Sequence, residues 1–336
     1  MPHSRPTIAD VAERAGVSIA TVSRVLYGTA PVDAETAERV RSAIAVLNYV
    51  PHAAARTLAS RRTDTIGLLL PEITGAFFQP MLRGVEAGVG EAGFNLLIHT
   101  TQSHPENAPR RPLGEHNTDG LLVFTESLDA RELTRLHSIG FPVVLLHQAP
   151  PDSLNIPVVT IENQSGAQKI VEHLIEVHNC RRIIFLQGPK GHEDTTWREK
   201  GYRLALEASN ISFDPALIVR GNFDRNVALA SVEKLLADGV SFDAIFTGDD
   251  ESAIGVLLAL RQSGRRVPED VAIVGFDDSL FANTLLPPLT TVRAPTEQVG
   301  IQAVRQLVRV IQGEEVESRL VLSTELTIRQ SCGCKG

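Results

Sequence analysis

Three stretches in the second half of the chain combine side chains that could bind a small polar molecule. They are Trp197-Arg198, Thr247 to Asp250, and Asp277-Asp278, and we expect each of them at the end of a buried strand. Carboxylates and a guanidinium can fix hydroxyl groups, while an aromatic face can cover the C–H groups of a sugar ring. Two acids with one arginine favour a neutral polyhydroxylated ligand over a phosphate or a dicarboxylate.

Each of these residues also has a purely structural interpretation. The pair Asp277-Asp278 could cap a turn, and Arg198 could pair with a surface acid. In the first half of the chain, Phe77-Phe78 and His147 are weaker candidates for the same site, and the two phenylalanines could belong to the core. Convergence of these residues on one cleft would favour the binding role.

The sequence offers little for catalysis. It contains no H-E-x-x-H, G-x-S-x-G or Walker motif, and its ten histidines are scattered, so we predict no enzyme, no metal and no other cofactor. Gly88 to Gly93 spells G-x-G-x-x-G, but it closes a predicted helix instead of opening one, so we do not expect it to bind a dinucleotide. Cys332-Gly333-Cys334 could be a redox pair or a metal-binding pair, although a solvated tail is the favoured interpretation.

The elements that must position these residues follow from the alternation of apolar runs and helical segments after Thr65. Buried strands are predicted at TIGLLLP, FNLLIHT, DGLLVF and FPVVLLH, and the cycle restarts after about Ile161 with RRIIFLQGP, FDAIFTGDD and VAIVGFDD. This α/β pattern indicates two doubly wound parallel sheets with a ligand cleft between them. Pro105, Pro109 and Pro112 cannot all lie inside one helix, so a shortened helix or a loop is expected there.

The first sixty residues follow a different pattern, that of a small all-α domain. Thr7 and Asp10 fit a capping box at the start of a helix that ends at Gly16. Ser18 caps a second helix, and a third helix over Asp33 to Asn48 closes the core. Two short helices joined by A-G-V-S match a helix-turn-helix whose second helix can enter the major groove of DNA.

The charge distribution agrees with DNA binding by this part of the chain. The whole chain carries 32 Lys and Arg against 40 Asp and Glu, a formal net charge of -8, whereas residues 1–62 carry eight Arg and five acids, a net charge of +3. The remainder therefore carries -11. A basic head can bind phosphates locally while an acidic body repels nonspecific contact with polyanions.

Residues 51–63 are predicted to form a hinge. The stretch HAAARTLAS is about two turns long, which is less than the ~12 to 15 residues that an isolated helix needs in water. Pro51 suits the first position of such a helix. We therefore expect the hinge helix to fold only against a partner.

Several motifs together resemble the LacI/GalR family of bacterial transcription repressors. They are ADVAERAGVSIATVSRVL, VRSAIAVLNYVP, AAARTL, VPEDVAIVGFDD and PPLTTVRAP, and they keep the order of the family through nearly the whole chain. The resemblance implies a helix-turn-helix head on a body of the periplasmic-binding-protein type. It also implies a cytoplasmic homodimer that reads a pseudo-palindromic operator on double-stranded DNA and is switched by a small molecule.

The resemblance divides the chain into domains. It places a DNA-binding domain at 1–50, a hinge helix and linker at 51–63, and a ligand-binding and dimerisation domain at 64–336. Within the last of these, the N-subdomain would comprise about 64–161 and 293–322, and the C-subdomain about 162–292 and 323–331.

The resemblance also assigns DNA contacts residue by residue. Ile19, Ala20 and Arg24 match positions that read bases, and Thr21, Ser23 and Thr36 match positions that contact phosphates. Thr7 is also expected among the DNA-binding residues. Leu58 matches the apolar wedge that the paired hinge helices insert into the minor groove, and Ala55 matches the small residue that lets these helices approach. Two positions depart from the family, since Tyr27 and His52 stand where Asn is usual.

For the ligand, the family match selects fewer residues than the strand ends alone. Arg198 in R-x-x-G-Y, Asp249, and Asp277 in G-F-D-D match contact positions, and Phe223 matches an aromatic wall. Trp197, Phe77 and Phe78 complete the candidate set. His147 stands where the family often has Asp.

Two alternatives remain open at this point. The ligand could be a purine or another metabolite that acts as a corepressor, instead of a sugar or polyol. A transport binding protein would share the body, but it would have a signal peptide and no helix-turn-helix head.

No apolar run approaches the ~20 residues that span a membrane, so no membrane partner is expected. No heptad repeat follows the last strand, so a dimer is expected instead of a tetramer.

Overall fold

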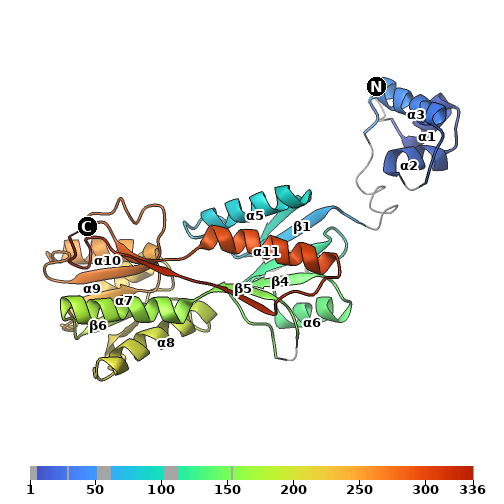
Figure 1. Ribbon diagram of the computed structural model, residues 1–336. Coiled ribbons are helices and arrows are strands. Elements are labelled where there is room, and N and C mark those ends of the chain that lie inside the picture. The colour runs from blue at the N-terminus through green and yellow to red at the C-terminus, as the bar shows by residue number, and fades with distance from the viewer. Residues whose placement is uncertain (1–5, 29, 51–61, 102–112, 153, 336) are drawn as a thin grey trace. The chain divides into compact units, whose positions relative to one another are not determined.

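The computed structural model describes residues 6–28, 30–50, 62–101, 113–152 and 154–335. These residues fall into two compact units, a small helical head and a larger α/β body that begins at Ile66 (Figure 1). Some of the positions predicted from the sequence lie outside the described residues, namely His52, Ala55, Leu58, Pro105, Pro109 and Pro112.

Three helices form the head, as the sequence predicts. They are α1 (Ile8–Ala15), α2 (Ile19–Tyr27) and α3 (Ala34–Leu47). Their apolar faces pack into one small core, in which each helix contributes a fully buried valine, namely Val11, Val22 and Val40. Because none of these short helices is stable alone in water, this shared core holds the head together.

The turn between α1 and α2 is held by local and long-range hydrogen bonds. Thr7 and Asp10 form the predicted capping box at the start of α1, with the Asp10 carboxylate accepting from the Thr7 amide at 2.6 Å. Gly16 adopts the left-handed conformation that ends α1, with φ of 63°. Arg39 of α3 donates from Nη2 to the Ala15 carbonyl at 2.6 Å, so α3 fixes the turn that orients α2.

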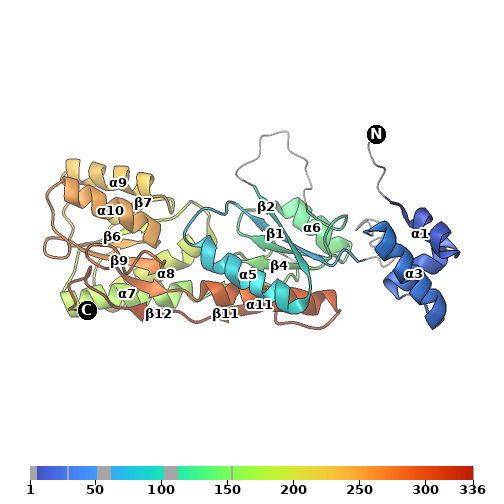
Figure 2. The same ribbon diagram turned by 90° about the horizontal axis from the view of Figure 1, so that it is seen from above.

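The body contains two six-stranded sheets, and Figures 1 and 2 show helices on both faces of each. We call the part built on the sheet β11-β5-β4-β3-β1-β2 lobe A. Its strands and helices are β1 (Thr65–Leu70), α5 (Phe78–Ala92), β2 (Asn95–Thr100), β3 (Gly120–Phe124), α6 (Ala130–Ser138), β4 (Val143–Leu146), β5 (Val158–Ile161), α11 (Thr296–Ile311) and β11 (Arg319–Leu322).

Lobe B is built on the sheet β12-β10-β9-β8-β6-β7. Its elements are α7 (Asn163–His178), β6 (Ile183–Gln187), α8 (Glu193–Ala208), the 3-10 helix η1 (Pro215–Leu217), β7 (Ile218–Arg220), α9 (Arg225–Ala237), β8 (Ala244–Thr247), α10 (Asp250–Gln262), β9 (Ala272–Asp277), β10 (Thr290–Arg293) and β12 (Glu325–Thr327). The pairs formed by β6, β7, β8, β9 and β10 among themselves are parallel, and β12 is antiparallel to β10. The predicted class, a helical head followed by two doubly wound sheets, is confirmed.

The chain crosses between the lobes three times, and hydrogen bonds join the crossing segments. The first crossing passes through Glu162, whose amide donates to the Leu322 carbonyl at 2.9 Å. In the third crossing, the Thr324 hydroxyl donates to the Glu162 carbonyl at 3.2 Å. In the second crossing, the Ala294 amide donates to the Asp277 carbonyl at 3.3 Å, so a predicted ligand residue touches a segment that links the lobes.

Two expectations are corrected by the structure. FNLLIHT forms β2, but as an edge strand of the sheet and not as a buried one, so Leu97 and Ile98 are each 40% exposed. Cys332-Gly333-Cys334 is not a solvated tail, because Cys332 is only 2% exposed and packs against lobe B. The strands β5, β7, β11 and β12 have three or four residues each, which is too short for a periodic signal in the sequence.

Gly88 to Gly93 closes α5, as expected. Gly93 caps that helix with φ of 76°, and a β-carbon on Gly88 would lie 2.9 Å from Val304 of α11, so this glycine allows two helices to pack closely. In the part of the chain that the structure describes, no helix is both long enough and apolar enough to cross a membrane.

We expect Gly84→Ala to destabilise the body by about 1 to 3 kcal/mol, as overpacking of a tight contact does. Gly84 lies on α5 where a β-carbon would collide with the Glu297 carbonyl oxygen of α11. Urea unfolding of the full chain measures the effect. Gly90→Ala is the matched control, because Gly90 lies on the same helix with no heavy atom within 4 Å, and alanine there should be neutral or stabilising. Equal unfolding midpoints for the two variants would contradict the close packing of α5 on α11.

Candidate ligand cleft and nucleic-acid interface

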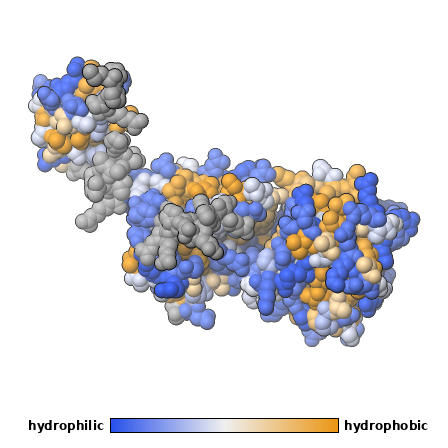
Figure 3. Space-filling model, turned by 180° about the vertical axis from the view of Figure 1, so that it is seen from behind, coloured by the Kyte–Doolittle hydropathy of each residue, from blue (hydrophilic) through white to orange (hydrophobic). Residues whose placement is uncertain are grey.

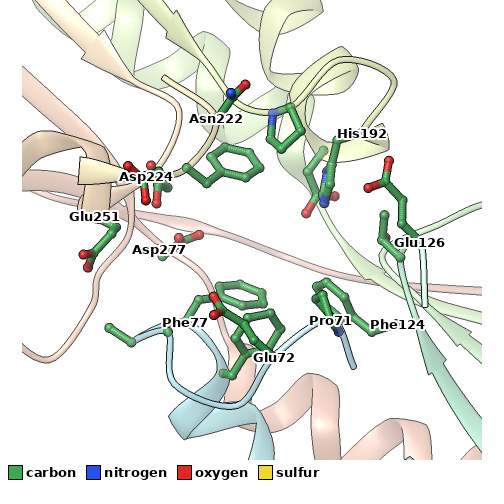
Figure 4. Close-up of a pocket in the computed structure, with 18 of the residues that line it drawn as sticks. Pro71, Glu72, Phe77, Phe124, Glu126, His192, Asn222, Asp224, Glu251 and Asp277 are labelled. Carbon is green, nitrogen blue, oxygen red and sulfur yellow. The ribbon is translucent and has the colours of Figure 1, made fainter. Parts of the chain in front are cut away.

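A pocket of about 390 Å³ lies between the two lobes of the body (Figure 4). Its lining comes from the segments that follow β1, β3, β6, β7 and β8 and from the last residue of β9. Because parallel strands of one sheet end at the same edge, these segments meet although they are far apart in the sequence. The volume lies within the ~300 to 1,000 Å³ typical of small-molecule sites.

A buried carboxylate, Asp194 at the start of α8, joins the two lobes. Its Oδ2 lies 3.0 Å from Nδ1 of His147, which follows β4 of lobe A. Its Oδ1 accepts from the Asn163 amide group at 2.7 Å. Burial alone would raise the pKa of Asp194, but the nearby His147 and Arg198 outweigh it and hold this pKa below its usual range. The carboxylate therefore stays ionised in the interior.

Arg198 forms one wall of the cleft and has most of its donors already engaged. It is 2% exposed, donates from Nε to Asn163 Oδ1 at 2.8 Å, and donates from Nη1 to the Gly248 carbonyl. Its Nη2 lies 3.5 Å from Asp277 Oδ1, and its guanidinium carbon lies 3.8 Å from the centroid of the Phe276 ring. Arg198 therefore positions the neighbouring groups as well as lining the cleft.

The lining is strongly acidic. Its carboxylates are those of Glu72, Glu126, Asp194, Asp224, Asp249, Glu251 and Asp277. Among the described lining residues, Arg198 is the only lysine or arginine. His192 also lines the pocket, and burial lowers its pKa, which favours the neutral imidazole. Such a cleft repels phosphates and carboxylates and offers acceptors to hydroxyl groups.

The predicted acids differ in how their carboxylates are used. Asp249 caps α10, where its Oδ1 accepts from the Ser252 amide at 3.1 Å, and burial raises its pKa to about 6. Asp277 has a φ of 113°, and burial raises its pKa well above the usual value. Asp250 does not line the pocket, because its oxygens accept from Thr291 Oγ1 at 2.6 Å and from the Ser279 amide at 2.7 Å.

Aromatic rings form two further parts of the wall, as Figure 4 shows for Phe77 and Phe124. Phe77 and Phe78 pack edge to face with ring centroids 5.4 Å apart. On the opposite lobe, Phe223 adopts a φ of 56°, and a β-carbon on Gly188 would collide with its ring. Glycine at that position therefore makes room for the aromatic wall.

Two candidates lie outside the lining. His147 is fully buried behind Phe77, with ring centroids 5.6 Å apart, and contacts Asp194 instead of the cavity. Trp197 donates from its indole nitrogen to Glu193 at 3.1 Å. Asp278, the neighbour of Asp277, pairs with Arg293 and Arg329 at 2.7 and 2.6 Å.

Several lining residues escaped the sequence analysis. They are Glu72, Glu126, His192, Asp194, Asn222, Asp224 and Glu251. Glu72 and Glu126 stand two residues after the ends of β1 and β3, as Asp249 does after β8, so the rule that selected Asp249 could have found them. Asp194 has no such signal, because it begins a helix and its partners are distant in sequence.

In the head, the predicted base-reading residues share one surface of α2. Ile19 is 51% exposed, and Ala20 and Arg24 are also exposed. Thr21, Ser23 and Thr36 are half-buried, and Thr7 is exposed at the capped start of α1. Exposed isoleucine on a short helix, next to an arginine and small residues, suits a surface that enters a DNA groove.

Comparisons with known proteins agree with both units. The model described as bacterial regulatory proteins, lacI family, matches residues 7–52, and a periplasmic binding protein-like domain matches residues 171–332. The chain is 39% identical over 337 residues to the HTH-type transcriptional regulator CelR of Thermobifida fusca, with 97% of this chain and 98% of that protein covered.

Two solved structures are similar over nearly the whole chain. One is a complex of the transcriptional regulator CelR with cellobiose, with a TM-score of 0.73, 36% identity, and coverage of 97% of this chain and 100% of that one. The other is a lac repressor dimer bound to operator and an anti-inducer, with a TM-score of 0.82, 25% identity, and coverage of 98% and 99%.

We expect Asp249→Asn to change the pH dependence of unfolding. The pKa of Asp249 is about 6 in the folded chain, above its ordinary value of 3.8. The protonated carboxyl therefore contributes stability that is fully present below about pH 4 and is lost as the pH rises through about 6. As the pH rises from about 5 to about 7.5, the free energy of unfolding of Asp249→Asn should increase by about 1 kcal/mol relative to that of the wild type. Urea unfolding at each pH measures this difference. Asparagine can still cap α10.

The control for this measurement is Asp270→Asn. Asp270 is exposed, and its hydrogen bonds with Arg266 lower its pKa to about 2, so it stays ionised throughout that pH range. A pH profile of Asp249→Asn that runs parallel to wild type would show that Asp249 is not the titrating group.

Proposed function

Because the chain belongs to the lacI family of bacterial regulatory proteins, we propose that it represses transcription as a homodimer on a pseudo-palindromic operator and responds to a sugar or polyol bound between its lobes. The family consists of DNA-binding transcriptional regulators that respond to ligands, and the chain is accordingly a regulator and not an enzyme.

The exposed surface of α2 supports the mode of DNA reading. Ile19, Ala20 and Arg24 would contact base edges, while Thr7, Thr21, Ser23 and Thr36 would contact phosphates. The net charge of +3 in residues 1–62 favours approach to the duplex. Following the family match, Ala55 and Leu58 would act at the centre of the operator, where Leu58 inserts into the minor groove.

The acidic cleft is the observation that carries the ligand class. The hydroxyl groups of a neutral polyhydroxylated molecule can donate hydrogen bonds to Asp249 and Asp277, and its C–H faces can pack on Phe77 and Phe223. An anion would instead be repelled by the acidic lining. Similarity to a regulator solved with cellobiose supports a sugar. A purine corepressor is the second candidate, because a planar ring could also pack against Phe223.

Changes in the angle between the lobes would carry the signal from the cleft. Asp277 contacts the second crossing segment through the bond from the Ala294 amide to its carbonyl, and Asp194 holds His147 across the lobes at 3.0 Å. A ligand beside these residues would favour one closure angle, and the hinge helices would pair or separate with it. Decisive switching requires a difference in ligand affinity between the two states of about 3 to 5 kcal/mol.

Exposed apolar side chains on both lobes support a homodimer. Apolar surface is visible on each lobe in Figure 3. Leu97 and Ile98 of β2 are exposed on lobe A, and Leu258 of α10 and Leu286 are exposed on lobe B. Contiguous apolar surface on a folded protein commonly marks a protein interface. Two copies would place two heads on the two halves of one operator.

If Arg24 reads a guanine edge, Arg24→Ala should cost about 1 to 3 kcal/mol on the operator and much less on random duplex DNA. Fluorescence anisotropy with an operator selected from a random duplex pool measures both affinities, and the wild-type endpoint should be two chains per operator. Arg41→Ala is the matched control, because Arg41 is exposed on α3 and pairs with Glu38 at 3.1 Å. Equal losses on the operator and on random DNA would make Arg24 a phosphate contact.

The ligand proposal predicts that Asp277→Asn separates sensing from DNA binding. A thermal-shift panel of cellobiose, other sugars, polyols and purines first identifies the ligand. Loss of a hydrogen bond to the Asp277 carboxyl should then weaken binding of that ligand by about 0.5 to 1.5 kcal/mol, while operator affinity without ligand stays at the wild-type value. Asparagine keeps the Oδ1 that faces Arg198. The exposed control Asp270→Asn should respond like wild type.

Stabilisation by purines alone in that panel would contradict the sugar or polyol and favour the second candidate. A wild-type ligand response in Asp277→Asn would remove Asp277 from the binding site.

A further inference from the structure

Four potential metal ligands that are scattered in the sequence come together at the end of lobe B. They are His173 and His178 of α7, and Cys332 and Cys334 near the end of the chain. One ligand atom from each of them lies within 4.8 Å of all the others. Neither the ligand cleft nor the DNA-binding surface uses these residues.

Three distances within this group agree with the sulfur–nitrogen edges of a tetrahedral metal site. His173 Nε2 lies 3.5 Å from Cys332 Sγ and 3.6 Å from Cys334 Sγ, and His178 Nε2 lies 3.4 Å from Cys334 Sγ. In a tetrahedron with Zn–S bonds of about 2.3 Å and Zn–N bonds of about 2.0 Å, sulfur and nitrogen are separated by about 3.5 Å. The three sulfur–nitrogen distances in this group match that value.

The backbone between the cysteines is shaped for this approach. Gly333 has a φ of 107°, and a β-carbon there would lie 3.2 Å from Nδ1 of His178, so glycine brings both thiols to the same side without a clash. Ser331, the residue before Cys332, is fully buried and links this segment to β9 and β10. Its hydroxyl accepts from the Thr290 amide at 2.8 Å and donates to the Ile273 carbonyl at 2.6 Å.

One of the thiols also has an outer hydrogen-bond partner. The Thr290 hydroxyl donates to Cys332 Sγ at 3.1 Å, and the same oxygen accepts from the Arg329 amide at 2.8 Å. The bond from Arg329 orients the hydroxyl proton toward the sulfur. Donors of this kind are common around metal-bound thiolates, which they hold in place and stabilise.

We propose that His173, His178, Cys332 and Cys334 form a structural site for a tetrahedral divalent metal, with Zn²⁺ as the ion that this ligand set suits best. Two thiolates and two imidazoles are a common zinc ligand set, and four protein ligands leave no open position for catalysis. On binding, the two thiols lose their protons to solvent and the two imidazoles bind in the neutral form.

The site is distant from the ligand cleft but is connected to it through α7. Asn163 begins α7 and bonds both Asp194 and Arg198, whereas His178 ends this helix of 16 residues. At about 1.5 Å per residue, the two ends lie roughly 22 Å apart. A metal at the far end would fasten the carboxy-terminal segment to α7 and steady the helix that carries Asn163.

The test measures metal in the untagged full-length protein, purified with reduced thiols, loaded with Zn²⁺ and dialysed. Elemental analysis should find about one zinc per chain. Replacement by Co²⁺ should give the intense visible bands and the thiolate charge-transfer band of a tetrahedral site. Cys334→Ser should lower zinc affinity by more than about 100-fold, since even outer-shell changes cost about 10- to 100-fold.

Cys180→Ala is the matched control, because Cys180 is a buried cysteine just beyond α7 and is not a member of the group. It should keep the zinc and the cobalt spectrum of wild type. The cobalt spectrum of the wild-type protein tests the site even where a variant folds poorly. Failure of the reduced wild-type chain to retain zinc, equal retention by Cys334→Ser, or a Cys332–Cys334 disulfide that persists under reducing conditions would overturn the proposal.

Discussion

The ionised carboxylate of Asp194 is the interaction on which the geometry of the cleft depends. Burying a charge is costly unless partners compensate it, and here His147 compensates it from lobe A while Asn163 and Arg198 do so from lobe B. Any change in the angle between the lobes must keep or replace these partners. The contact between Asp194 and His147 therefore favours the arrangement of the lobes that the structure shows.

The amino-terminal part of the chain and the cleft carry opposite charges. Residues 1–62 have a net charge of +3, which comes from Arg56, Arg61 and Arg62, because residues 1–50 hold five arginines and five acids. The exposed face of α2 presents small residues and Arg24, while the cleft is lined by acids with Arg198 among them. A polyanion such as DNA is repelled from the acidic cleft and attracted by the arginines of residues 1–62.

The last segment of the chain contributes to both lobes. It supplies β11 to the sheet of lobe A and β12 to the sheet of lobe B, and then places Cys332 and Cys334 beside α7. α7 has Asn163 in the Asp194 network at one end and His178 in the proposed metal site at the other. A fastened α7 would give the network a rigid support on lobe B, which matters because a misplaced buried charge is expensive.

The sequence by itself determined the elements and their class. The capping box at Thr7, the turn at Gly16 and the alternation of strands and helices depend on contacts within a few residues, so periodicity and turn chemistry are enough to predict them. The same local reasoning placed Gly88 to Gly93 at the end of a helix, where the structure has it. It also predicted Asp249 and Asp277 at strand ends, and both line the pocket because parallel strands deliver their last residues to one edge.

Only the tertiary structure decided how distant side chains meet. His147 and Asp194 are 47 residues apart in the sequence, and Cys332 is 159 residues from His173, so no local pattern predicts either contact. His147 faces Asp194 instead of the cavity, and β2 is exposed because it lies at the edge of its sheet. These outcomes depend on how two sheets and their covering helices pack, and packing is a property of the whole chain.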